Sequence, residues 1–257
     1  MLSVSHFCIR LSPIVAVQQF RFRGYKLFHE HPEAARSMCR QSETFPAFFT
    51  PRTDRPLIVD CGANIGVTML EWKHRWPGAE IICFEPDPHA FRLLQMNVDR
   101  NDIPSVRCVQ AAVSDHSGTA TLHGEIAAGG DARGNSIDPS WGRRPGSDET
   151  SVPCVQLSTY LQDRSVDFLK LDIEGLEERV LTEISAHLPQ VEAIYVEVHE
   201  TATTAAYNSA SRIAAMLRAA GFEIELQHRD ESHSLPQSQR HWQSRVTARQ
   251  SQLLGWR

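Results

Sequence analysis

The chain has 257 residues and a formal net charge of −5, and 41% of its residues are hydrophobic and 22% charged. This composition is typical of a globular protein with one large or two small domains and argues against a chain that is disordered throughout. The acidic balance argues against a nucleic-acid-binding protein, which needs a basic face. No apolar run approaches the ~18–20 residues of a membrane-spanning helix. We therefore expect neither a nucleic-acid partner nor a membrane span.

The six cysteines form no Cys-x-x-Cys pair, so their spacing does not predict a zinc site. Cys61, Cys83 and Cys108 stand in apolar runs, where a free thiol behaves as a small hydrophobic group. Free thiols are typical of a reducing compartment, and the first residues lack the apolar stretch of a signal peptide. We therefore expect a cytoplasmic protein.

In chain order, residues 1–54 are rich in aromatic residues and interrupted by prolines, and we expect a small N-terminal arm or cap there. Strands are predicted at 57–61, 80–84, 106–113, 166–171, 192–198 and 222–227, and helices between them at 67–76, 88–100, 176–187 and 209–220. Nearly continuous apolar strands that alternate with helices predict an α/β domain over residues 55–228, with a mostly parallel sheet covered on both faces.

Two segments interrupt this alternation. Residues 124–151 are rich in glycine and proline, and we expect a long loop or a loose hairpin that acts as a lid. Residues 229–257 form a polar tail, which we expect to be either disordered or docked on the surface through its last apolar residues.

A glycine-rich turn follows the first predicted strand, in the pattern Asp60-x-Gly62-x-Asn64-x-Gly66. Such a turn lets the backbone approach a ligand closely, and the helix that follows offers free N–H groups. Glu85 ends the second strand, where a carboxylate can accept two hydrogen bonds from a ribose diol. The turn lacks the GxGxxG spacing of nicotinamide-binding domains, because Asn64 takes the place of the second glycine.

The sequence resembles the FkbM family of S-adenosylmethionine-dependent methyltransferases over roughly 57–199. Ile58-Val-Asp60-Cys-Gly62-Ala-Asn64-Ile-Gly66 is similar to the first methyltransferase motif. The other matching blocks are Cys83-Phe84-Glu85-Pro86-Asp87-Pro88 with Leu94, Asn97 and Asn101 behind it, Ala112-Val-Ser-Asp115-x-x-Gly118, Val166-Asp-Phe-Leu-Lys170-Leu-Asp172-Ile-Glu174-Gly175, and Val196-Glu197-Val-His199.

The resemblance implies a Rossmann-like methyltransferase fold, with about six or seven strands in the central sheet, and S-adenosylmethionine as the cofactor. It implies that the methionine end of the cofactor is held by Asp60, Gly62, Ala63, Asn64 and Gly66. It further implies that Glu85 and Pro86 lie at the ribose, and that Ala112 and Asp115 lie near the adenine.

Polar side chains follow the fourth and fifth predicted strands. Lys170 and Asp172 are two residues apart and share a strand face, Glu174 follows them, and Glu197 and His199 are spaced in the same way. Because ligands of open α/β sheets bind at the carboxyl ends of the strands, these groups should meet beside the transferred methyl group.

Two chemical roles are open for this group. Lys170, Asp172, Glu174 and His199 are candidate general bases for a hydroxyl acceptor. Alternatively, Asp172, Glu174 and Glu197 could bind Mg²⁺, which prefers oxygen ligands. We favour the metal, because three carboxylates repel each other unless a cation or protons neutralise them.

The predicted loop also carries Arg133, Asn135, Arg143 and Arg144, and arginine side chains suit phosphate or carboxylate groups. An acidic glycan or a nucleotide sugar would fit them.

The leading hypothesis is an S-adenosylmethionine-dependent methyltransferase that O-methylates a hydroxyl on a sugar, a glycan or a small-molecule natural product. The alternatives are a non-catalytic binding module that keeps the methyltransferase fold, and a nicotinamide-dependent oxidoreductase.

Overall fold

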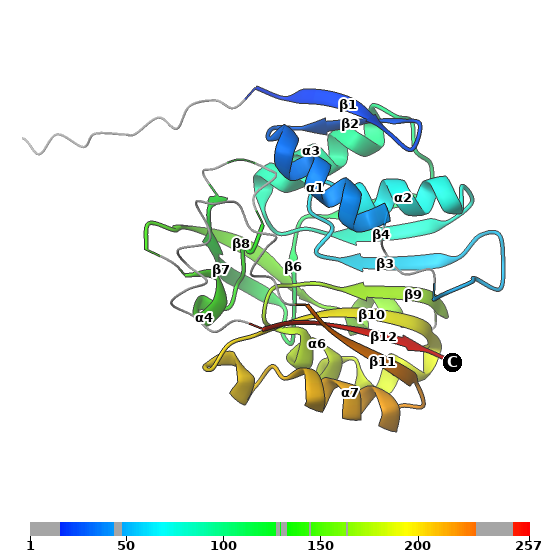
Figure 1. Cartoon of the computed structure of the whole chain (residues 1–257), viewed down its shortest axis with the longest axis vertical. Helices are drawn as coiled ribbons and strands as arrows, with labels where there is room; N and C mark the ends of the chain where they lie inside the picture. The colour runs from blue at the N-terminus through cyan, green and yellow to red at the C-terminus, as the bar shows by residue number, and fades with distance from the viewer. Residues whose placement is uncertain are drawn as a thin grey trace, which may run out of the picture.

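The computed structural model describes residues 16–43, 48–126, 129, 133–143, 145–162, 164–229 and 249–257. Its centre is a seven-stranded sheet in the order β11-β12-β10-β9-β3-β4-β5 (Figure 1). The strands are β3 (Leu57–Cys61), β4 (Glu80–Phe84), β5 (Val106–Val109), β9 (Val166–Leu171), β10 (Val191–Glu200), β11 (Glu223–Arg229) and β12 (Arg249–Trp256). Strand β12 is antiparallel to both of its neighbours, and β10, β9, β3, β4 and β5 are parallel. The predicted α/β fold, a Rossmann-like arrangement with a mostly parallel sheet, is confirmed.

Helices cover both faces because the central strands are apolar on both sides; all five residues of β3 are buried. One face packs against α5 (Ser158–Leu161), α6 (Glu177–Glu183) and α7 (Ala210–Ala219). The other face packs against α1 (Pro32–Glu43), α2 (Val67–Arg75) and α3 (Pro88–Asp99). Short 3₁₀ helices at Ser185–Gln190 and Thr204–Ala206 stand before and after β10. In the described part of the chain, no helix has the length and apolar character needed to cross a bilayer.

The N-terminal residues are more regular than the proline-rich sequence predicts. They form a hairpin of β1 (Gln18–Phe22) and β2 (Tyr25–His29), followed by α1. Asn97 of α3 and Asn101, in the turn after α3, hold the hairpin: Phe28 N–H donates to Asn97 Oδ1 at 2.6 Å, and Lys26 N–H donates to Asn101 Oδ1 at 2.7 Å. The same two amides donate back to the carbonyl groups of Phe28 and Lys26. The two asparagine side chains thus make the backbone hydrogen bonds with β2 that a neighbouring strand would otherwise make.

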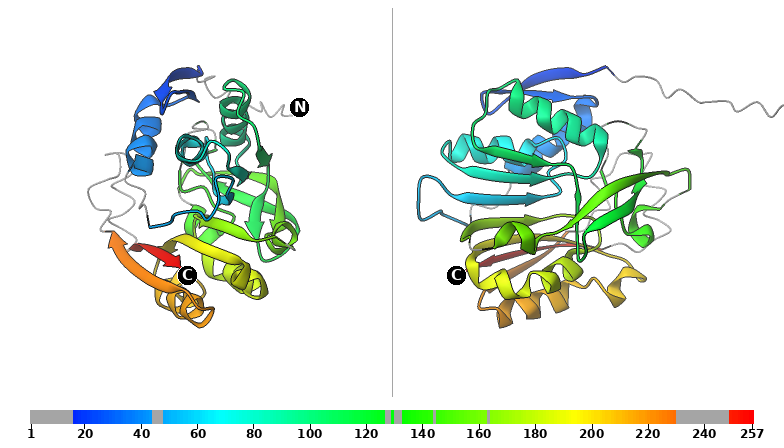
Figure 2. Two further views of the ribbon diagram at one scale, coloured as in Figure 1. Left: turned by 90° about the vertical axis from the view of Figure 1, so that its right-hand side faces the viewer. Right: turned by 180° about the vertical axis from the view of Figure 1, so that it is seen from behind.

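A second sheet, which we call the insert sheet, lies between β5 and β9 in the chain. It has the order β6-β8-β7, with β6 (Ala112–Ser114), β7 (Gly118–Gly124), β8 (Asp148–Gln156) and, beside it, α4 (Pro139–Gly142). Figures 1 and 2 place it at the edge where the parallel strands end. The single strand predicted over 106–113 is therefore wrong: β5 stops at Val109 and the chain enters another sheet at Ala112.

Of the two forms predicted for residues 124–151, a long loop or a loose hairpin, the ends of the segment form a hairpin, because β7 and β8 pair antiparallel from Gly118↔Cys154 to Gly124↔Asp148. The prediction of a disordered or surface-docked tail over 229–257 is wrong for the last residues of the chain. Residues 249–256 form β12, which is buried between β10 and β11, with Leu253 and Leu254 at 0% and 1% exposure. Residues 230–248 of that tail lie outside the described residues.

Candidate active site

The turn between β3 and α2, residues 62–66, has a backbone that only a few residue types adopt; we call it the cofactor turn. Gly62, Asn64 and Gly66 have positive φ angles of 84°, 48° and 87°. A Cβ atom on Gly62 would stand 1.9 Å from the carbonyl oxygen of Asp172. Only glycine therefore lets the cofactor turn lie directly against the end of β9.

Glu85 directly follows β4 and is 6% exposed. Its carboxylate accepts a hydrogen bond from Asn64 N–H and another from Asp87 N–H, both at 2.8 Å. Burial, followed by the nearby charge of Asp87, raises the pKa of Glu85 to about 8. Glu85 therefore borders the cofactor turn and lines the same pocket.

Asp60 and Lys170 form a buried ion pair beneath the cofactor turn. Lys170 Nζ lies 3.2 Å from Asp60 Oδ1 and 3.2 Å from Asp172 Oδ2, and it donates to the carbonyl oxygen of Gly62 at 3.0 Å. Burial alone would lower the pKa of Lys170, but the charges of Asp60 and Asp172 outweigh it and raise that pKa. These contacts favour an ammonium group that orients the turn and Asp172 over a general base.

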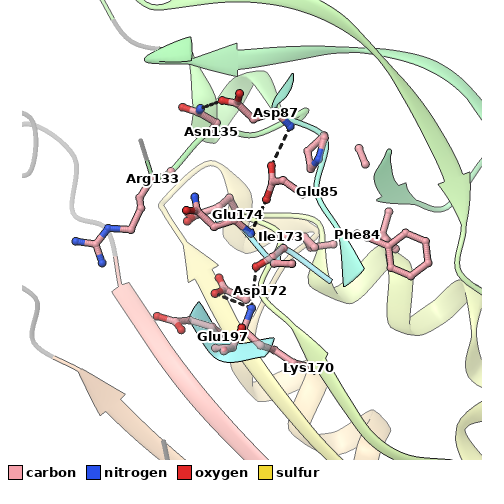
Figure 3. Close-up of a pocket in the computed structure, with 18 of the residues that line it drawn as sticks. Phe84, Glu85, Asp87, Arg133, Asn135, Lys170, Asp172, Ile173, Glu174 and Glu197 are labelled. Atoms are coloured by element: carbon pink, nitrogen blue, oxygen red, sulfur yellow. Dashed lines mark hydrogen bonds and ion pairs between the residues drawn. The ribbon is translucent and has the colours of Figure 1, made fainter. Parts of the chain in front are cut away.

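One pocket joins the cofactor turn, the carboxyl ends of the strands and the insert (Figure 3). The predicted site residues that line it are Gly62, Ala63, Asn64, Glu85, Pro86, Ala112, Lys170, Asp172, Glu174 and Glu197. The predicted residues outside this lining are Asp60, Gly66, Asp115 and His199. Asp115 is directed elsewhere: its carboxylate contacts His116 Nδ1 at 2.8 Å on the insert sheet.

The side chains of Asp172, Glu174 and Glu197 form what we call the carboxylate rim. Glu174 has a left-handed backbone with φ of 60°, and its Oε2 accepts a hydrogen bond from Trp141 Nε1 at 2.7 Å. Behind it, His199 Nε2 lies 3.2 Å from Glu174 Oε2, and His199 Nδ1 lies 3.1 Å from Glu177 Oε1. Burial would lower the pKa of His199, but the neighbouring Glu174 and Glu177 raise it well above its ordinary value.

Glu197 is held differently from the other two carboxylates. Tyr195 O–H donates to it at 2.8 Å, and Gln250 of β12 donates to its other oxygen. Burial, with repulsion from Asp172, raises the pKa of Glu197 to about 7. Among the described residues, the group whose metal-ligating atoms all lie within 4.8 Å of one another is Asp172, Glu174 and His199. The sequence predicted Glu197 as the third metal ligand beside Asp172 and Glu174, whereas the structure places His199 in that position.

The described part of the predicted lid is bonded to both sides of the pocket. Asn135 Nδ2 donates to Asp87 Oδ2 at 2.7 Å, and Ser136 Oγ donates to the carbonyl oxygen of Glu174 at 2.6 Å. Arg133 also lines the pocket, but Arg143 pairs with Glu149 at the surface. Arg144 lies outside the described residues. Of the two loop arginines that the structure describes, Arg133 lines the pocket and Arg143 does not.

Several lining residues are missing from the sequence-based prediction. They come from α1, from the middle of β10 and from β12: Met38, Gln41, Ser42, Tyr195 and Gln252. The period-two spacing of Tyr195 and Glu197 on one strand could have identified Tyr195. The other four lie on elements that the sequence analysis did not predict, so no local signal pointed to them.

Comparison with known proteins gives a family and a fold. The family model described as "Methyltransferase FkbM domain" matches residues 60–224. The chain is 29% identical to the 31-O-demethyl-FK506 methyltransferase FkbM of Streptomyces tacrolimicus, over 65% of this chain and 73% of that protein. It is 28% identical to the methyltransferase sdnD of Sordaria araneosa (66% and 74%) and 28% identical to the 2-O-methyltransferase NoeI of Sinorhizobium fredii (55% and 63%).

Among solved structures, the methyltransferase FkbM of Methylobacillus flagellatus matches with a TM-score of 0.52 and 15% identity. The match covers 82% of this chain but 46% of that one, so the chain spans less than half of that protein. This likeness concerns the fold alone. The family match decides against the oxidoreductase and the non-catalytic binding module. The chain belongs to the FkbM family of methyltransferases, which use S-adenosylmethionine as the methyl donor.

Proposed function

We propose that the protein transfers a methyl group from S-adenosylmethionine to a hydroxyl group of a sugar, a glycan or a small natural product. The observation that carries this proposal is the contact of Gly62 with the carbonyl group of Asp172, which joins the cofactor turn and the carboxylate rim in one pocket. The printed names of two relatives, a 31-O-demethyl-FK506 methyltransferase and a 2-O-methyltransferase, support oxygen as the acceptor atom.

Three groups of residues fit the cofactor. The methionine end would lie at Gly62, Ala63 and Asn64, and Glu85 would accept hydrogen bonds from the ribose hydroxyls. The adenine would lie among apolar side chains that include Ala112 and Leu122. Asp115 is directed away from this pocket and has no role in the proposal.

When bound, S-adenosylmethionine would supply a methyl group on a positively charged sulfonium sulfur, and the electron pair of the carbon–sulfur bond would remain on the sulfur of the thioether product. Asp172 accepts the proton of the acceptor hydroxyl while the oxygen forms its bond to the methyl carbon. The ion pair with Lys170 orients the Asp172 carboxylate for this step. Alignment of reactants contributes up to roughly 7–11 kcal/mol in well-oriented cases, and a general base about 10²–10⁴-fold in rate.

A divalent cation such as Mg²⁺ is the second candidate for this rim. The ligand atoms of Asp172, Glu174 and His199 lie close enough together to bind one. However, basic side chains of the protein already reduce the repulsion among the carboxylates, because Lys170 contacts Asp172 and His199 contacts Glu174. This arrangement supports Asp172 as a direct base over the metal route that the sequence favours.

The variant Asp172→Asn tests the proposal. We expect turnover to fall by about 10²-fold or more with nearly unchanged affinity for S-adenosylhomocysteine. Transfer of labelled methyl to the best acceptor in a panel of hydroxyl compounds gives the turnover, and calorimetry gives the affinity. The matched control is Glu223→Gln, which removes an exposed carboxylate on β11.

A chelator arm separates the two routes. The direct-base route predicts that a chelator leaves the wild-type rate unchanged. A rate abolished by the chelator and restored by Mg²⁺ would support the metal instead. Turnover of Asp172→Asn close to that of the wild type would contradict both routes.

A cytoplasmic location is also proposed. It is supported by the free thiols of Cys39, Cys61, Cys83, Cys108 and Cys154, most of them buried.

A further inference from the structure

Part of the pocket wall comes from elements outside the matched family domain. That domain covers residues 60–224, whereas α1 and β12 lie at Pro32–Glu43 and Arg249–Trp256. Helix α1 supplies Met38, Gln41 and Ser42 to the pocket lining, and β12 supplies Gln252. We call these four residues the outer wall.

Helix α1 has a fixed position relative to the pocket. Met38 and Cys39 pack in the same core cluster as Trp72 of α2 and Leu254 of β12. Arg23 lies 2.6 Å from Glu71 of α2 and 3.8 Å from Glu43 at the end of α1. Across the pocket mouth, Arg133 Nη1 donates to Gln41 Oε1 at 2.8 Å. Gln41 is therefore held at the mouth from two sides.

Strand β12 places Gln252 beside the carboxylate rim. Gln252 is the register partner of Glu197 on β10, so the two side chains share one face of the sheet. Tyr195 stands on that same face, two residues before Glu197. Gln252 is 3% exposed, and Gln250, two residues before it, donates to Glu197. The floor of the pocket next to the proposed base is thus lined by an amide and a phenol.

The charges around this wall select against an anionic acceptor. The described lining includes Asp172, Glu174 and Glu197, and its cations are Lys170 and Arg133. Lys170 is already paired with Asp60 and Asp172, and the Arg133 guanidinium points away from the carboxylate rim toward Gln41 (Figure 3). Lys170 and His199 offset Asp172 and Glu174, but Glu197 has no such cation in contact with it among the described residues, and the rim would still disfavour a carboxylate or phosphate next to the reacting hydroxyl.

We infer that Gln41 and Gln252 determine the acceptor by bonding to the hydroxyls beside the one that is methylated, and that the acceptor is a neutral polyol such as a saccharide. This inference rests on the proposed methyl transfer. A side-chain amide both donates and accepts hydrogen bonds, which matches a hydroxyl group in either role. Gln41 at the mouth and Gln252 on the floor would each form a hydrogen bond with a different hydroxyl of the same sugar ring.

The test uses the full chain, labelled S-adenosylmethionine and four probes. These are methyl glucoside, methyl glucuronide, trans-cyclohexane-1,2-diol and cyclohexanol, which differ in charge and in the number of neighbouring hydroxyls. The variants are Gln41→Leu and Gln252→Leu, with Gln95→Leu on the exposed face of α3 as the matched control. Calorimetry with S-adenosylhomocysteine and a thermal melt establish that each variant is folded and binds the cofactor product.

The wild type should methylate the neutral glucoside with a higher kcat/KM than the glucuronide or cyclohexanol. Each glutamine variant should raise the KM for the glucoside about tenfold, the effect of one lost hydrogen bond. The kcat/KM for cyclohexanol and the affinity for S-adenosylhomocysteine should stay unchanged.

Three results would overturn the inference. They are preference for the glucuronide, an unchanged KM for the glucoside in both variants, or transfer to none of the neutral polyols by a protein that binds S-adenosylhomocysteine. Failure of the proposed function is recognised separately, because a protein that binds neither S-adenosylmethionine nor its product would contradict the methyl transfer itself.

Discussion

A pocket residue can be placed for ligand binding at a cost in the stability of the folded protein, and Glu85 is the clearest example. Its carboxylate is buried between backbone N–H groups, in the position proposed for the ribose, and this burial raises its pKa to about 8. The folded protein therefore holds the Glu85 proton more tightly than the unfolded chain does. This contribution to the free energy of unfolding is complete below about pH 4.5, the ordinary value, and is lost as the pH rises through about 8.

The variant Glu85→Gln should remove this pH dependence. We expect the cofactor-free variant to melt at a higher temperature than the wild type at pH 9, with the difference shrinking toward pH 5. At pH 9, where the Glu85 carboxylate is ionised, the free energy of binding S-adenosylhomocysteine should weaken by about 1.5–3 kcal/mol, because a charged hydrogen-bond acceptor is lost. Thermal melts across this pH range and calorimetry measure the two effects. A variant that melts below the wild type at pH 9 would argue against the buried, proton-holding carboxylate.

At the scale of elements, the amide of Asn97 on α3 connects the N-terminal hairpin to the cofactor turn. Asn97 is fully buried, bonds to both backbone groups of Phe28 and donates to the carbonyl oxygen of Ile65 at 2.8 Å. Asn101, one helical turn further, bonds to Lys26 near the surface. The two asparagines therefore make similar contacts with β2, but only Asn97 reaches the cofactor turn.

Replacing Asn97 by alanine should lower the free energy of unfolding by about 2–4 kcal/mol, because buried backbone groups lose their partners. The same variant should weaken binding of S-adenosylhomocysteine, since Ile65 belongs to the cofactor turn. Asn101→Ala is the control, with an expected loss of about 1 kcal/mol or less and unchanged binding. Urea unfolding and calorimetry compare them, and equal effects of the two substitutions would contradict the proposed connection.

At the scale of the whole molecule, the stability of the central sheet depends on β12, a strand that the sequence pattern does not predict. Strand β12 lies between β10 and β11, and Leu254 packs in the same core cluster as Tyr195 and Phe168. Leu254→Ala should therefore cost about 2–5 kcal/mol in urea unfolding, as in any well-packed core. Leu226→Ala on β11, which is only partly buried, should cost clearly less. A loss at Leu254 below that at Leu226 would be the result expected of a loosely docked tail.

The sequence predicted the parts of the site that obey local rules. The cofactor turn, Glu85 and the acidic residues after β9 follow their strands directly, and Glu197 lies near the end of β10, so spacing along the chain sufficed. It did not predict β12, because Gln250, Ser251 and Gln252 are polar residues in a buried strand, and their partners on β10 are remote in the chain. The hairpin was missed for a related reason: β2 is held by asparagine side chains instead of by a strand.

The placement of β12 also bears on how the protein folds. Along the chain, β11 is the next strand after β10. In the sheet, however, β12 lies between them, although it is synthesised after both. Until residues 249–256 are available, β10 and β11 each present an unpaired edge, the kind of surface from which strands join wrong partners. Closing the sheet requires a late, long-range pairing, which is slow by its loop-closure entropy. The same pairing brings Gln252 to the pocket, so a chain in which β12 has not yet joined the sheet would lack this part of the pocket wall.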